Sequence, residues 1–185
     1  MLLRELSSFG FWLVANIPHG LGARIRALVL PLILGHLGRN TVVQSGMRIT
    51  HPKRVSIGSN CNVGQDVFIT GGGGVRIGDW VGLGPDVKIW SVNHRFDDPD
   101  RPWLLQGWEL KEVVIEDDVW LGAGVFVMAG VTIGKGAIIS AGTVLNKTVP
   151  PYSVVAGNPG RVIGWRKHPD GMTAVPSPPS VDAAS

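Results

Sequence analysis

The sequence predicts an all-β fold of the solenoid type, in which short parallel strands coil around one core. Three observations predict it: aliphatic residues recur every six positions, a small or β-branched residue stands two positions before each, and glycine directly follows six of the twelve. The aliphatic row is Ile57, Val63, Ile69, Ile77, Leu83, Ile89, Ile115, Leu121, Val127, Ile133, Ile139 and Leu145. The partner row is Val55, Cys61, Val67, Val75, Val81, Val87, Val113, Val119, Val125, Val131, Ala137 and Thr143.

The period itself excludes a helix, because helical side chains return to one face every 3.6 residues and not every six. Residues two apart share a face of a β-strand, so each aliphatic residue and its partner point the same way. A repeat of six then means that each short strand turns a corner before the next begins. Glycine suits such corners because it has no Cβ to clash in a crowded turn.

Length and composition set further bounds. The 185 residues fit one domain that can bury a continuous core. The single cysteine, Cys61, excludes an internal disulfide and occupies a partner-row position, which favours core packing and leaves a reactive thiol as the alternative. The net charge of +3 is modest, and no basic run is interleaved with aromatic residues, so we expect no nucleic-acid partner.

Residues 1–40 lack the period and predict a helical cap made of two short helices, roughly 3–16 and 20–35. Charged residues interrupt this apolar stretch, so it does not predict a transmembrane span, and Glu5 argues against a signal peptide. Two interpretations stay open: the helices cap the open end of the solenoid, or they also rest on a membrane surface. We therefore expect a cytoplasmic protein, with the inner face of the membrane as a further location.

The repeating domain is expected over residues 41–166, and two insertions interrupt it. Ile69 and Ile77 are eight residues apart, so two extra residues bulge within the glycine run 71–74. Ile89 and Ile115 are 26 residues apart, which predicts that about 20 residues, 92–111, are extruded as a loop. Residues 167–185, rich in proline and small polar residues, predict a disordered tail.

The extruded loop carries the best candidate for acid–base chemistry. His94 stands at its root, where a rigid strand fixes the backbone, and a neutral imidazole can accept a proton near pH 7. A loop histidine can equally be an ordinary surface residue. The other histidines are scattered without metal-ligand spacing, so no metal site is predicted.

Two further features need a partner. Trp120 stands between two core positions and must face outward, where it could bury against a neighbouring subunit, a ligand or the loop. The segment 147–168 contains four basic and no acidic residues, a charge of +4, and could either meet a polyanionic small molecule or form a solvated basic end. No arrangement for a covalent acyl-enzyme is apparent.

Three motifs carry a resemblance to a known family. They are SVNHRFDDPD at 91–100, IEDDVWLGAGVFVMAGVTIGKGAIISAGTVL at 115–145 and KTVPPYSVVAGNPGRVI at 147–163. With the repeat, they resemble the hexapeptide-repeat acyltransferases, in particular the branch of maltose, galactoside and polysaccharide O-acetyltransferases. The resemblance implies a left-handed parallel β-helix, a homotrimer with active sites between neighbouring coils, acetyl-CoA as co-substrate and a carbohydrate acceptor.

The resemblance also implies roles for individual residues. His94 matches the general base, and Trp120 the tryptophan beside the pantetheine arm. Ala123 stands where the family often has serine, whose N–H helps to hold the oxyanion. The other implied acetyl-CoA contacts are Ala141, Gly142, Asn146, Lys147, Arg161 and Arg166, and the implied acceptor contacts are Asp66, Asn93 and Asp98. Asn146 departs from the threonine of some relatives, and the glycine run 71–74 replaces polar acceptor-binding residues.

Three functions are therefore compared. The first is O-acetylation of a carbohydrate hydroxyl in polysaccharide or cell-surface glycan synthesis. The second is N-acetylation of an amino sugar, which needs less help from a base and would tolerate loss of His94. The third is a non-catalytic solenoid that serves as a scaffold, which would not release thiol from acetyl-CoA.

Overall fold

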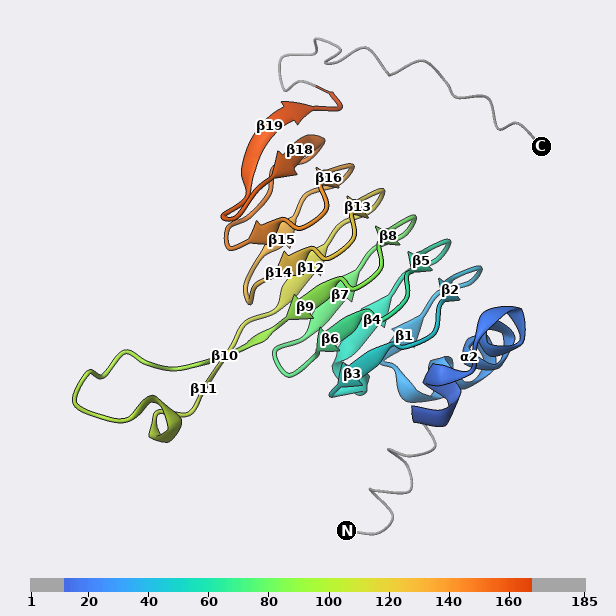
Figure 1. Cartoon of the computed structure of the whole chain (residues 1–185), viewed down its shortest axis with the longest axis horizontal. Helices are drawn as coiled ribbons and strands as arrows, with labels where there is room; N and C mark the ends of the chain where they lie inside the picture. The colour runs from blue at the N-terminus through green and yellow to red at the C-terminus, as the bar shows by residue number, and fades with distance from the viewer. Residues whose placement is uncertain (1–11, 168–185) are drawn as a thin grey trace.

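A computed structural model gives the fold and describes residues 12–167. Within them, residues 12–16 are helical, and α2 follows at His19–Ile33, close to the expected second helix. The expected start of the first helix and nearly all of the expected tail, residues 168–185, lie outside the described residues. Figure 1 shows the coil rising from α2 at one end to the pair of strands β18 (Ser153–Ala156) and β19 (Arg161–Trp165) at the other.

The coil has three faces, each formed by short strands that stack in parallel from turn to turn (Figure 1), and the last strand of sheet B pairs antiparallel at its end. Sheet A contains β1 (His36–Leu37), β4 (Val55–Ile57), β7 (Val75–Ile77), β12 (Val113–Ile115) and β15 (Thr132–Ile133). Sheet B contains β2 (Val42–Val43), β5 (Asn62–Val63), β8 (Gly82–Leu83), β13 (Trp120–Leu121), β16 (Ile138–Ile139), β18 (Ser153–Ala156) and β19 (Arg161–Trp165). Sheet C contains β3 (Arg48–Thr50), β6 (Phe68–Thr70), β9 (Lys88–Trp90), β14 (Phe126–Val127) and β17 (Val144–Leu145).

The register explains the six-residue period. Ile57 pairs with Ile77, and Ile115 joins this column between Ile77 and Ile133. All twelve residues of the aliphatic row and all twelve partners are buried, so the sequence-based core prediction is confirmed. Burying each aliphatic side chain contributes roughly 1.5–3 kcal/mol, and the stacked columns form one continuous core.

The helical cap is held to the first coil by a buried arginine. Arg26 is 1% exposed and donates to the carbonyls of Val43 (2.8 Å), Ile17 (2.8 Å) and Val14 (3.1 Å). Leu30 is buried in the main core. The first strand, β1, follows α2 closely, so pairing in sheet A begins before residue 41. Within residues 12–167, no helix is long and apolar enough to cross a membrane.

Both predicted insertions are present. The run 71–74 forms the turn between β6 and β7, and Gly74 has a φ of +93°, a conformation that glycine adopts without strain. The larger insertion projects from the coil as a hairpin (Figure 1), with β10 (Val92–His94) antiparallel to β11 (Trp108–Leu110). Two 3-10 turns are η1 (Pro52–Arg54) and η2 (Trp103–Leu105), the latter at the hairpin tip.

Candidate active site

The His94 side chain is held between two tryptophans at the base of the hairpin. Its ring centroid lies 3.8 Å from that of Trp108 and 4.6 Å from that of Trp103. Trp108 is its cross-strand partner, and the backbone N–H of His94 donates to Asn93 Oδ1 at 3.0 Å. The imidazole therefore has a defined position on a paired strand, although the sequence only indicated a loop.

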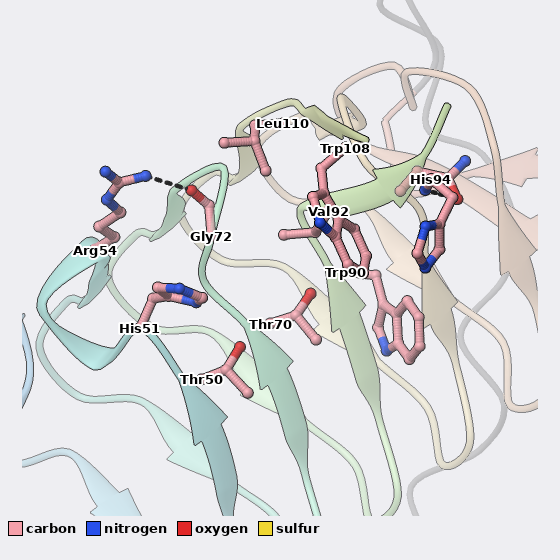
Figure 2. Close-up of a pocket in the computed structure, with 11 residues that line it drawn as sticks. Thr50, His51, Arg54, Thr70, Gly72, Trp90, Val92, His94, Trp108 and Leu110 are labelled. Carbon is pink, nitrogen blue, oxygen red and sulfur yellow. Dashed lines mark hydrogen bonds between the residues drawn. The ribbon is translucent and has the colours of Figure 1, made fainter. Parts of the chain in front are cut away.

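The hairpin overhangs a pocket of about 600 Å³ between sheet C and the η1 turn (Figure 2), here called the hairpin pocket. It is lined by Thr50, His51, Arg54, Thr70, Gly72, Trp90, Val92, Asn93, His94, Trp108 and Leu110. Volume and aromatic walls are typical of a small-molecule site, with His94 available as a proton acceptor. Of the expected acceptor contacts, only Asn93 lines this pocket.

Sequence reasoning missed most of the lining, although one signal was available. Thr50, Thr70 and Trp90 are register partners on β3, β6 and β9, and each is the last residue of its strand. Thr70 and Trp90 directly follow the core residues Ile69 and Ile89, and Thr50 follows the equivalent residue of β3. A search along the repeat would therefore have found this column. Nothing in the period indicated that His51 and Arg54 face it.

Asp66 and Asp98, the other two expected acceptor contacts, lie elsewhere. Asp66 precedes β6 and so lies near the start of this strand, whereas the hairpin pocket lies at its end. Asp66 lines a second depression with Trp12 and Asp86. Asp98 organises the hairpin tip, since its N–H donates to Gln106 Oε1 at 3.0 Å and its carbonyl accepts from Gln106 Nε2 at 2.7 Å. The structure brings neither into the hairpin pocket.

Trp120 lies on the outer face of sheet B and is 56% exposed. A Cβ added at Gly82, its register partner, would stand 3.2 Å from Trp120 Cδ1, so glycine leaves room for the indole. Ala123 follows in the exposed turn after β13, and its carbonyl accepts from the Gly142 N–H at 2.9 Å. Ala141 and Gly142 form the equivalent exposed turn one coil further on, so these small residues line one edge of the coil.

The remaining expected cofactor contacts lie near the β18–β19 end. Asn146 and Lys147 are exposed and border a small cavity of about 40 Å³ beside that pair. Arg161 is exposed, and its Nη1 donates only to the carbonyl of Gly160, at 2.9 Å, within the described chain. Arg166 is instead paired with Asp118 at 2.9 Å and donates to the Gly136 carbonyl at 2.8 Å, which occupies part of its guanidinium.

His94 and Ala123 belong to different edges of the coil. The hairpin leaves the chain after β9, where sheet C gives way to sheet A, whereas Ala123 lies before β14, where sheet B gives way to sheet C. The two edges are separated by the width of sheet C along its strands, which is about five residues of extended chain or roughly 16 Å. One copy of the chain therefore does not bring the expected base to the expected cofactor groove.

Cys61 is part of the hydrophobic core. It is 3% exposed, its Sγ contacts the Gly78 carbonyl at 3.1 Å, and burial raises the pKa of the thiol. Both effects oppose thiolate formation, so the reactive-thiol alternative is disfavoured. Residues 12–167 contain no group of three or more histidine, cysteine, aspartate or glutamate side chains that could hold a metal ion.

Comparisons with known proteins connect this three-faced β-solenoid to a class of transferases built from hexapeptide repeats. Two family models match: "Bacterial transferase hexapeptide (six repeats)" over residues 112–147 and "Hexapeptide repeat of succinyl-transferase" over residues 54–84. Nodulation protein L of Rhizobium meliloti (strain 1021) is 37% identical over 163 residues, which cover 86% of this chain and 87% of that protein.

Two solved structures extend the comparison. The hexapeptide-repeat acetyltransferase VCA0836 of Vibrio cholerae, complexed with acetyl coenzyme A, superposes with a TM-score of 0.77 at 31% identity, over 85% of this chain and 84% of that one. A maltose O-acetyltransferase from Clostridium difficile 630 gives a TM-score of 0.75 at 31% identity, over 86% and 84%. The chain belongs to the hexapeptide-repeat transferase family. It is an acyltransferase, as are the acetyltransferases that it resembles, which removes the scaffold alternative.

Proposed function

We propose that this enzyme transfers an acetyl group from acetyl-CoA directly to a carbohydrate hydroxyl, in polysaccharide or cell-surface glycan synthesis, with His94 as general base. The observation that carries the proposal is the His94 imidazole, fixed by Trp103 and Trp108 at the wall of the hairpin pocket. The acetyl-CoA complex of VCA0836 and the maltose O-acetyltransferase support the choice of donor and of acceptor class.

In the proposed reaction, His94 Nε2 takes the proton of the acceptor hydroxyl as its oxygen attacks the thioester carbonyl. The N–H of Ala123 donates to the oxyanion that develops on that carbonyl, and alanine serves as well as serine because the donor belongs to the backbone. When the C–S bond breaks, the proton held by His94 passes to the departing thiolate. The neutral imidazole is then restored, and the products are the acetyl ester and CoA.

The proposed acetyl-CoA groove follows the edge formed by Ala123, Ala141 and Gly142. Gly142 has a φ of +71°, and a Cβ there would meet no atom within 4 Å, so the surface beside it is open to a pantetheine arm. Trp120 would pack against that arm, with Asn146 at its end. Lys147 and Arg161 would meet the phosphates, whereas Arg166 would first have to leave Asp118.

The active site is proposed to form between copies of the chain in a homotrimer. His94 and Ala123 lie at different edges of one coil, and a closed cyclic assembly places one edge of each copy against another edge of its neighbour. Each hairpin would then lend His94 to the groove of the adjacent subunit.

The helical cap is proposed to touch the inner face of a membrane while the enzyme stays in the cytoplasm. Leu21, Leu28 and Leu32 on α2 are 68%, 76% and 76% exposed, and Arg24 lies among them. Such a face can lie in a lipid interface without crossing it. Sedimentation with anionic vesicles checks this: binding that Leu28→Ser with Leu32→Ser does not weaken would contradict the proposed surface.

The proposed function is tested by following CoA thiol release with a panel of sugars. His94→Ala should lower acceptor-dependent release by about 10²–10⁴-fold, the usual contribution of a general base. The amount of thiol released in the presence of sugar should equal the amount of acetyl ester formed. Activity of His94→Ala within a few-fold of the parent would refute the role of His94, and sparing of an amino-sugar substrate alone would point to N-acetylation.

A further inference from the structure

The charges that line the hairpin pocket point to the chemical class of the acceptor. We infer that the acceptor is an anionic glycan, whose carboxylate or phosphate group binds at His51 and Arg54 while the reacting hydroxyl meets His94. The inference rests on the proposed function and deepens it, since it concerns the acceptor end of the same site. It is drawn from the lining residues, which include these three basic side chains and no aspartate or glutamate.

Arg54 is anchored with donors to spare. It ends the η1 turn, and its Nη1 donates to the Gly72 carbonyl at 2.6 Å, which orients the guanidinium at the pocket (Figure 2). No carboxylate within residues 12–167 forms an ion pair with Arg54. A guanidinium has five N–H donors in a planar fork, so the remaining ones can receive a carboxylate or a phosphate.

His51 lies beside Arg54 and is kept open to the pocket by the glycine run. A Cβ at Gly72 would come 2.5 Å from Val92 Cγ2 and 3.7 Å from His51 Nδ1, so a larger residue would fill the space that Gly72 leaves. Figure 2 shows His51 and Arg54 at the opposite side of the pocket from His94. A sugar that places a hydroxyl at His94 would therefore direct its far end to these two side chains.

The charge of the sequence around His51 and Arg54 supports the same ligand. Residues 6–65 contain six arginines and lysines and no aspartate or glutamate, and they include both His51 and Arg54. The acid opposite Asn93 in the hairpin, Glu109, is compensated by Lys111 at 2.8 Å. A concave site with one sign of charge concentrates ligands of the opposite sign. Binding of a neutral sugar does not require positively charged side chains, because neutral donors and acceptors hold hydroxyl groups as well.

The test compares matched acceptors with the purified full-length protein. Thiol release is followed with a neutral glucan oligosaccharide, a uronate oligosaccharide of equal length, methyl glucoside, methyl glucuronide and glucose 1-phosphate. The last two separate a carboxylate from a phosphate as the recognised group. The parent should favour the anionic member of each pair by about tenfold or more in kcat/KM, and added salt should reduce the preference.

Two Arg54 variants and one control assign the preference to the pocket. Arg54→Gln should reduce the anionic-to-neutral ratio by about tenfold through KM, and Arg54→Lys should retain most of it, which a purely structural role would not produce. His51→Asn is chosen because asparagine tolerates the φ of 53° at this position. Combined with Arg54→Gln, it should reduce the anionic-to-neutral ratio further. Arg39→Gln, an exposed arginine outside the pocket, should leave the ratio unchanged.

Each outcome decides the question. Preference for neutral acceptors in the parent, or an unchanged ratio in Arg54→Gln, would overturn the inference while the O-acetyltransferase function stands. Thiol release that no sugar of either class accelerates would overturn the proposed function together with the inference.

Discussion

The imidazole of His94 and the indole of Trp108 lie against each other across the base of the hairpin, with ring centroids 3.8 Å apart and planes at 36°. Because the two residues are cross-strand partners, backbone pairing fixes the contact. The proposed base therefore has its orientation set by a residue that is distant from it in the sequence.

This contact makes Trp108 a positioning residue for the proposed base. Trp108→Leu should lower kcat by about 10–100-fold, because small displacements of a catalytic group are costly, while the melting temperature changes little for this exposed site. Steady-state thiol release and a thermal melt check both parts. Phe96→Leu, in the same hairpin and 70% exposed, should behave as the parent. A Trp108→Leu enzyme with full kcat would show that His94 needs no such support.

Trp120 should act on acetyl-CoA and not on the acceptor. Trp120→Ala removes the exposed indole that the proposed groove uses, so the KM for acetyl-CoA should rise by about tenfold. The KM for the sugar should stay within about twofold, because Trp120 is not among the residues that line the hairpin pocket. Val42→Ala, an exposed substitution on the same sheet, is the control. An equal rise in the KM for acetyl-CoA and in the KM for the sugar would contradict a role of Trp120 in acetyl-CoA binding alone.

Mixed assemblies test whether each active site spans two copies. His94→Ala lacks the proposed base, and Ala141→Trp should block the proposed groove, so each protein alone should be inactive. If they are unfolded together in equal amounts and refolded, each site has about a one-half chance of an intact hairpin and a one-half chance of an intact groove. About a quarter of the parent activity should return. Complete inactivity of mixtures that contain folded hybrid assemblies would mean that each site lies within one chain.

The sequence predicted the core better than the site because only the core is periodic. The positions of Ile57, Cys61 and Thr143 follow from a repeat of six, and all three are buried. The extrusion of residues 92–111 was also predicted from the break in the repeat, although its β-hairpin pairing was not. His51 and Arg54 have no counterpart in the repeat, so only the path of the η1 turn reveals that they share a pocket with His94.

Long-range polar contacts were beyond sequence reasoning for a related reason. The resemblance placed Arg166 among the acetyl-CoA contacts, yet it pairs with Asp118, 48 residues away in the chain. Arg26 was treated only as an interruption of an apolar helix, yet it is buried among main-chain carbonyls. In both cases, which partner an arginine meets depends on how the coils stack, and no local pattern records it.

Arg26 should be the residue on which the helical cap depends. Arg26→Leu would leave the buried carbonyls of Val43 and Ile17 without their donor, at a cost of about 2–3 kcal/mol in the stability of the cap. Hydrogen exchange and limited proteolysis should report faster opening of residues 12–34, while the core strands keep their protection. Arg24→Leu, on the exposed face of the same helix, is the matched control and should leave exchange unchanged. Uniform protection in Arg26→Leu would mean that Leu30 and the apolar contacts hold the cap without these hydrogen bonds.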